Sequence, residues 1–292
     1  GFFVSAFRSI LVENSDFENN SVTTGGHPAL YVVSNTTVNV TGCRFGGNVG
    51  KNGSAAVAVQ LSATVVAHIV DNVFVDNIGE GEGSLHIGAV SGSECRLTNN
   101  TFSNNTAKYG TVLLFGDANA IIAFTNNRFA NNTATISGGA VYLNLTSSQY
   151  TASGNRYENN TATVGGAEYC VCTDCNYKVY NHTYLNNVAS AGHGGGLWLN
   201  ATAVGIAYVN ISGSIFDANR AQENGGGLFL NTSETSVMAL VSGNLFVRNR
   251  AKFGGGLNLL GTSQAQFNVT SNTFSDNHVT LNGGGLLAGL TN

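Results

Sequence analysis

The 16 acidic side chains and six histidines are the first candidates for chemistry in this chain. Cleavage of a sugar polymer needs two acids near enough to share one sugar ring or one Ca²⁺. Aligned on the repeat described below, Asp76 shares a column with Asp276, and Glu18 shares one with Asp217, but each pair lies seven repeats apart. The histidines form no column: His27, His68, His86, His182, His193 and His278. We expect no enzymatic activity, no metal site and no cofactor.

Five cysteines form the second group of reactive side chains. Cys95 occupies an apolar column of the repeat and Cys43 a neighbouring one, nearly two repeats away, beyond disulfide reach. Cys170, Cys172 and Cys175 lie within six residues, where a local disulfide is the favoured interpretation. A metal would need a fourth ligand, and free thiols are the remaining alternative.

Asn-x-Ser/Thr sequons form the third and largest group. There are 14 of them: Asn19, Asn35, Asn39, Asn52, Asn99, Asn104, Asn131, Asn144, Asn159, Asn181, Asn200, Asn210, Asn231 and Asn268. They predict covalent N-glycans on a protein of a eukaryotic secretory pathway. The alternative is that turns rich in Asn, Ser and Thr create sequons incidentally.

The composition of the 292 residues excludes several partners. Charged residues make up only 10% of the chain, and the net charge is −4, so no basic surface favours nucleic acid. Apolar runs such as 112–115 and 121–124 are too short to span a membrane. The 38 glycines and 39 asparagines indicate an all-β protein rich in turns.

An internal repeat determines the architecture. An aromatic residue recurs ten times at steps of 27 to 32 residues: Phe17, Phe45, Phe74, Phe102, Phe129, Tyr157, Tyr184, Phe216, Phe246 and Phe274. An asparagine follows three residues later in every copy: Asn20, Asn48, Asn77, Asn105, Asn132, Asn160, Asn187, Asn219, Asn249 and Asn277.

Two apolar columns precede each aromatic, by five and by seven residues. A separation of two places both columns on one face of a strand. We therefore predict an all-β parallel β-helix solenoid of about ten coils with three short strands per coil, built as a single domain over residues 1–292. Coils stacked about 4.8 Å apart would place the aromatics in an inward stack and the ten asparagines in an amide ladder.

The recurring Phe-x-x-Asn and Gly-Gly-Ala pattern resembles the passenger repeats of chlamydial polymorphic outer membrane proteins. More broadly it is similar to parallel β-helices of the pectin-lyase type, which are right-handed. The resemblance covers the whole chain: Phe-x-x-Asn occurs eight times with Tyr in the other two copies, and Gly-Gly-Ala stands at 138–140 and 165–167. It implies an extracellular surface or adhesive role.

The position of the sequons in the repeat is informative. Asn39, Asn210 and Asn268 fall between the two inward columns, so they should point outward. No ladder asparagine is itself a sequon, because Val, Gly or Ala stands two residues later in every copy. The pattern predicts glycans on the outer faces and unmodified amides inside.

Large apolar residues also face outward after the glycine-rich steps: Tyr31, Leu113, Tyr142, Trp198, Phe229 and Leu287. This stripe would contact a protein or a sugar, or be covered by glycans or by the chain's own turns.

Together these observations favour a structural, non-enzymatic extracellular glycoprotein module of a surface fibre, appendage or matrix. A carbohydrate-binding or adhesive module is the alternative, and a polysaccharide lyase or hydrolase comes third. Because 1–4 and 283–288 read as parts of coils, we expect a segment of a longer chain or a protomer that stacks end to end on another solenoid segment.

Overall fold

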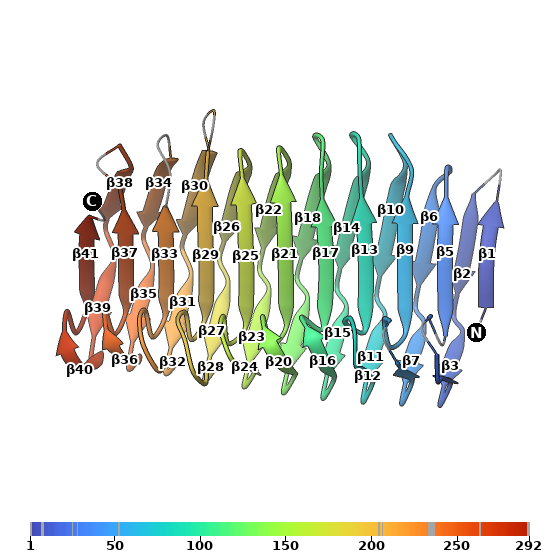
Figure 1. Cartoon of the computed structure of the whole chain (residues 1–292), viewed down its shortest axis with the longest axis horizontal. Helices are drawn as coiled ribbons and strands as arrows, with labels where there is room; N and C mark the ends of the chain where they lie inside the picture. Colours follow the sequence, from blue (N-terminus) through green and yellow to red (C-terminus); the bar gives the residue numbers. More distant parts are fainter. Residues whose placement is uncertain are drawn as a thin grey trace.

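The computed structural model describes residues 2–6, 9–24, 26–27, 29–51, 53–203, 205, 207–232, 237–262 and 264–290, with the backbone alone for residues 2–6 and 290. These residues form strands and turns and no helix. The strands make four parallel sheets, called here sheets A to D, and each sheet runs along the rod with the strands of successive coils side by side on its long axis (Figure 1). The chain visits the four sheets in turn, so each circuit is one coil of a β-solenoid.

Sheet A contains eleven strands and follows the glycine-rich steps. Its strands are β1 (Phe2–Ala6), β5 (Leu30–Ser34), β9 (Val57–Leu61), β13 (Leu85–Ala89), β17 (Val112–Gly116), β21 (Val141–Thr146), β25 (Glu168–Thr173), β29 (Leu197–Thr202), β33 (Leu228–Thr232), β37 (Leu257–Gly261) and β41 (Leu286–Leu290). Sheet B carries the two apolar columns. Its strands are β2 (Ile10–Glu13), β6 (Val38–Thr41), β10 (Val66–Val70), β14 (Glu94–Thr98), β18 (Ile121–Thr125), β22 (Gln149–Ser153), β26 (Asn176–Tyr180), β30 (Ala207–Ser212), β34 (Val237–Ser242) and β38 (Gln266–Thr270).

Sheet C carries the repeated aromatic at the centre of each three-residue strand. Its strands are β3 (Asp16–Glu18), β7 (Arg44–Gly46), β11 (Val73–Val75), β15 (Thr101–Ser103), β19 (Arg128–Ala130), β23 (Arg156–Glu158), β27 (Thr183–Leu185), β31 (Ile215–Asp217), β35 (Leu245–Val247) and β39 (Thr273–Ser275). Sheet D follows the ladder asparagine. Its strands are β4 (Ser21–Val22), β8 (Val49–Gly50), β12 (Ile78–Gly79), β16 (Thr106–Tyr109), β20 (Thr133–Ser137), β24 (Thr161–Ala162), β28 (Val188–Ala189), β32 (Arg220–Ala221), β36 (Arg250–Phe253) and β40 (His278–Asn282).

The prediction of three strands per coil is wrong, because sheet D adds a fourth strand to each coil. The segment after each ladder asparagine forms a strand of two to five residues that pairs in parallel with the next coil, with a register shift between Ala107 and Tyr109 in β16. Its inward residue is Val, Gly or Ala in every coil, and at the glycines the chain bends back too closely to leave room for a side chain. A Cβ on Gly79, for example, would lie 2.0 Å from the Glu82 carbonyl oxygen.

The core is a set of stacked columns, as predicted. The ten aromatics of sheet C stack with ring centroids 4.6 to 5.0 Å apart and planes within 14° of parallel. The inward residues of sheets A and B join them in one apolar cluster. Because each coil places the same residue type at the same position, each inward side chain packs against the equivalent side chain of the next coil.

Two of the four corners share a local rule: a left-handed residue is followed by an inward polar residue. Asn99 and Asn126 have φ of 55° and 53° at the corner between sheets B and C, and Asn104 and Asn131 have φ of 57° between sheets C and D. Asparagine and glycine tolerate this conformation better than other residues. The corners thus account for much of the asparagine content.

The ten predicted ladder asparagines lie at the corner between sheets C and D and are joined side chain to side chain by nine consecutive hydrogen bonds. Each Nδ2 donates to the Oδ1 of the next coil over 2.9 to 3.1 Å. Eight of the ten are buried, and Asn20 and Asn277 are half-buried. The ladder therefore satisfies amides that water cannot reach.

We predict that Asn132→Ala destabilises the protein. Asn105 donates its backbone N–H and its side-chain amide to Asn132 Oδ1, both over 3.0 Å, and Asn132 Nδ2 donates to the Phe102 carbonyl. Removal leaves these buried groups unpaired, which costs on the order of 1–3 kcal/mol for each group. The measurement is the melting temperature, with Ser103→Ala on the outward side of the adjacent coil as control. Equal losses in the two variants would refute a stabilising ladder.

Candidate functional site

Six sequon asparagines lie at the left-handed corner positions. They are Asn19, Asn99, Asn104, Asn131, Asn159 and Asn181, all with φ between 53° and 57°. All six are exposed, and each precedes an inward residue of a corner column. The requirement for a left-handed residue explains asparagine at these positions whether or not they carry sugar.

Six other sequon asparagines lie within strands and point away from the core. Asn144, Asn200 and Asn231 are on sheet A, and Asn39, Asn210 and Asn268 are on sheet B. Asn268 is exposed and the other five are half-buried. Asparagine is a poor strand former, so the fold gives no reason for it here, apart from one bond of 2.8 Å from Asn231 Nδ2 to Asn200 Oδ1.

The two remaining sequons lie outside both groups. Asn35 is exposed in the turn after β5, and Asn52 lies outside the described residues. Among the thirteen sequon asparagines that the structure describes, none is buried. Whether they carry glycans stays a prediction.

A second amide ladder, absent from the sequence prediction, lies at the corner between sheets B and C. Asn72, Asn100, Asn127 and Asn155 are joined by side-chain hydrogen bonds of 3.0 to 3.1 Å. In the next coil His182 takes the same position, and its Nε2 lies 3.0 Å from Asn155 Nδ2. The signal was present, since asparagine precedes the aromatic by two residues in six coils, but the exceptions concealed it.

The cysteines divide into one disulfide and three free thiols. Cys172 and Cys175 are joined, with Cα atoms 5.5 Å apart, across the turn between β25 and β26. Cys43, Cys95 and Cys170 are free and buried. Burial raises the pKa of all three thiols, which keeps them protonated and unreactive.

A polar cluster interrupts the apolar core in the middle of the rod. Glu168 occupies an inward position on β25, between Val141 and Leu197 of the adjacent strands. Its carboxyl group accepts hydrogen bonds from Tyr177 and Tyr184 at 2.7 and 2.8 Å. Complete burial raises the pKa of Glu168 despite the hydrogen bonds of the tyrosines, which lower it.

His182 adjoins this cluster through Tyr184, whose hydroxyl lies 3.2 Å from His182 Nδ1. Complete burial lowers the pKa of His182 to about 3, because the imidazolium would lose its hydration. With no opening to solvent, Glu168 and His182 form a structural group inside the rod rather than a site that a substrate could enter.

Two of the four acids named in the sequence analysis form ion pairs with arginine. Glu18 pairs with Arg44 at 2.8 Å, and Asp217 pairs with Arg248. His86 Nδ1 lies 2.6 Å from Glu82 Oε2 on the surface. Burial opposes ionisation of Glu82, but the hydrogen bond and charge of His86 outweigh it and lower the Glu82 pKa. Within the described ranges, no three His, Cys, Asp or Glu side chains converge on a metal position.

The outward aromatic stripe runs across sheet A and includes one ring that the sequence pattern missed. Tyr142, Tyr169 and Trp198 stack in successive coils, with centroids 5.0 and 4.1 Å apart. The sequence pattern did not predict Tyr169 as part of the stripe, because Glu168 stands before it where other coils have Leu or Val. Gly165 turns past Tyr169 with φ of 62°, and a Cβ on it would lie 2.9 Å from the Tyr169 Cβ.

The bends before sheet A cover part of this stripe. Tyr109 meets the Tyr142 ring edge to face at 5.5 Å, and the His193 ring stacks on Phe229 at 4.9 Å. Leu113 and Phe229 are nearly buried, whereas Tyr142, Tyr169 and Trp198 are half-buried. The exposed part of the stripe is therefore the stack of Tyr142, Tyr169 and Trp198.

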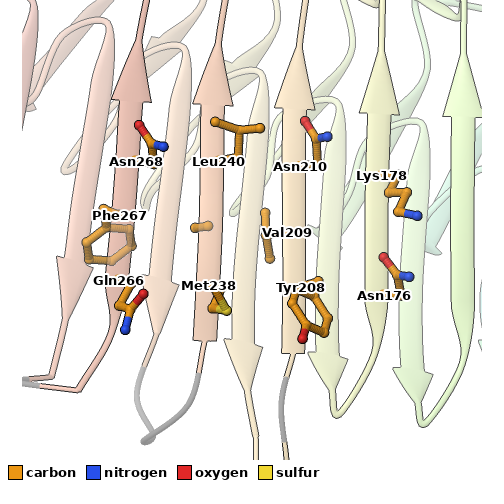
Figure 2. Close-up of a pocket in the computed structure, with 11 residues that line it drawn as sticks. Asn176, Lys178, Tyr208, Val209, Asn210, Met238, Leu240, Gln266, Phe267 and Asn268 are labelled. Atoms are coloured by element: carbon orange, nitrogen blue, oxygen red, sulfur yellow. The ribbon is translucent and has the colours of Figure 1, made fainter.

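A groove of about 650 Å³ crosses the outer face of sheet B over β26, β30, β34 and β38 (Figure 2). Tyr208 and Met238 line it and are each 46% exposed. Leu240 lies between Asn210 and Asn268, which are its register partners on the two adjacent strands. The groove thus has apolar side chains beside two sequon asparagines, and the polar side chains of Asn176, Lys178 and Gln266 complete its lining.

Comparison with known protein families, curated protein sequences and solved structures finds no significant match to this chain. No helix in the described part of the chain has the length and apolar character needed to cross a membrane.

We predict opposite pH effects for His182→Asn and Glu168→Gln. The unfolded chain protonates His182 below pH 6.5 while the fold excludes the proton until about pH 3, so stability is lost as the pH falls. At pH 5 this loss is on the order of 2 kcal/mol. The pKa of Glu168 is raised in the fold, so the folded protein loses stability as the pH rises above 4.5.

Melting temperatures at pH 5 and pH 8 check both signs. For each variant the quantity compared is its Tm minus the Tm of the protein without the substitution. This difference should be more positive at pH 5 than at pH 8 for His182→Asn, and more positive at pH 8 than at pH 5 for Glu168→Gln. Differences that do not change with pH would contradict the burial of these groups.

Proposed function

We propose that this chain is a structural, non-enzymatic glycoprotein module of an extracellular fibre, cell-surface appendage or matrix. Its faces would carry N-glycans added in a eukaryotic secretory pathway, and its core would supply a stiff rod. The resemblance of its repeats to those of chlamydial polymorphic outer membrane proteins supports a surface location. Its partners would be other solenoid segments, because a parallel ladder extends by the addition of a coil with the same cross-section.

The sequons within strands carry this proposal. Corner chemistry accounts for the asparagines at left-handed positions, but it does not account for Asn39, Asn144 or Asn210, which are outward strand residues. There the alternating strand pattern permits many polar residues that favour strands more than asparagine does. N-linked attachment of sugar is a function that only asparagine in a sequon provides.

Interior chemistry is consistent with a structural role. The first amide ladder and the aromatic stack repeat with every coil, so one cross-section is maintained along the rod. The described acids of the outer faces pair with arginine, lysine or histidine in several coils. This arrangement stabilises a surface of low charge.

Site-resolved mass spectrometry of protein secreted by a eukaryotic cell tests the proposal. We predict glycans on the outward strand residues Asn39, Asn210 and Asn268. The ladder residues Asn77 and Asn249 serve as internal controls that should be unmodified. Material that carries no glycan on any strand sequon would contradict the proposed function.

A carbohydrate-binding or adhesive module is the second candidate, favoured by the stack of Tyr142, Tyr169 and Trp198. Aromatic side chains combine an apolar surface with polar edges, as recognition of sugars requires. Under this function, a free oligosaccharide titrated into the protein would bind, and Tyr169→Ala would weaken binding about tenfold or more, equivalent to about 1.4 kcal/mol. An unchanged affinity in Tyr169→Ala would exclude the stack as the binding surface.

A further inference from the structure

Four of the six strand sequons have an aromatic residue two positions earlier on the same outward face. Residues i and i+2 of a strand point to the same side. Aromatic residues make up only 9% of the chain, so they occur at this position far more often than the composition predicts. The pairs are Tyr142 with Asn144 on β21, Trp198 with Asn200 on β29, Tyr208 with Asn210 on β30 and Phe229 with Asn231 on β33.

Four of the six corner sequons also follow an aromatic residue by two positions, but they do not have the same arrangement in space. Asn131 follows Phe129 by two residues, yet Phe129 is fully buried in the aromatic stack. Asn131 is left-handed and exposed, because the corner turns the chain between the two residues. The spacing alone therefore does not bring a ring beside a sequon; only the strand geometry does.

Three of the four rings, those of Tyr142, Trp198 and Tyr208, have surface that the protein leaves uncovered, whereas Phe229 is only 5% exposed. Tyr208 is 46% exposed, and in Figure 2 its ring and the Asn210 amide project from the same strand. Trp198 is half-buried, with Tyr169 stacked on one side at 4.1 Å. Such exposed aromatic surface is costly in water unless something covers it.

We propose that Tyr142, Trp198 and Tyr208 are the packing surface for the chain's own N-glycans, with the first sugar of each glycan against the ring two residues before its asparagine. This inference rests on the proposed function. An N-acetylated sugar presents C–H groups and a methyl group to the ring, and its covalent tether gives it a high effective concentration there. In the groove, sugars on Asn210 and Asn268 also cover Leu240 and Met238.

Trp198 provides a direct probe, because it is the only tryptophan in the chain. All variants carry Asn231→Gln, so that the adjacent coil contributes no sugar. Thr202→Ala removes the Asn200 sequon and leaves Asn200 and Trp198 in place, whereas Thr202→Ser keeps the sequon. Thr133→Ala is the matched control, since it removes the sequon of Asn131, whose preceding ring is in the core.

The measurement is acrylamide quenching of Trp198 fluorescence on secreted protein, with glycan occupancy at each site from mass spectrometry. Thr202→Ala should raise the quenching constant about twofold, because the covered part of the ring becomes accessible. Thr202→Ser and Thr133→Ala should leave it unchanged.

Two results would overturn the inference while the proposed function stands. In the first, Asn200 carries a glycan but Thr202→Ala does not change the quenching constant. In the second, Asn200 carries no glycan in material that is glycosylated at Asn39 and Asn268. Absence of glycan from every sequon would instead overturn both. A twofold rise in Thr133→Ala as well would show a general effect of glycan loss, and would also contradict the specific contact.

Discussion

A buried asparagine amide has two hydrogens to donate and an oxygen that accepts two bonds, and all of them must be satisfied without water. Asn132 meets this requirement only because Asn105 and Asn160 stand one coil to either side and the Phe102 carbonyl accepts the second hydrogen. The bond pattern repeats along the rod, so each coil requires its neighbours. Parallel pairing, the aromatic stack and the left-handed corners all follow from keeping these amides in register.

This constraint separates the inside of the molecule from the outside. Inward positions accept few residue types, and where polar groups replace apolar ones, as with Glu168, tyrosines surround them. Outward positions carry no such demand and are free to vary. The presence of asparagine at outward strand positions such as Asn39 and Asn210 therefore requires a chemical reason other than folding, and glycosylation supplies one.

Most of the fold could be predicted because its signals repeat. Ten copies of one aromatic and one asparagine revealed the stack and the first ladder. Sheet D was missed because its shortest strands have two residues, too few for an alternating pattern to appear. The second ladder was missed because Cys43, His182 and Ser214 interrupt it. The contacts of Glu168 with Tyr177 and Tyr184 lie 9 and 16 residues apart in sequence, and only the folded coil brings them together.

The most direct test of this account is hydrogen exchange of the asparagine side-chain amides, followed by NMR of protein with isotope-labelled asparagine. Burial and pairing on both sides predict that the amides of the inner ladder residues, such as Asn105 and Asn132, remain protonated long after those of exposed residues such as Asn35 and Asn126 have exchanged. Exchange of all asparagine side chains at one common rate would show that no buried ladder holds the coils together.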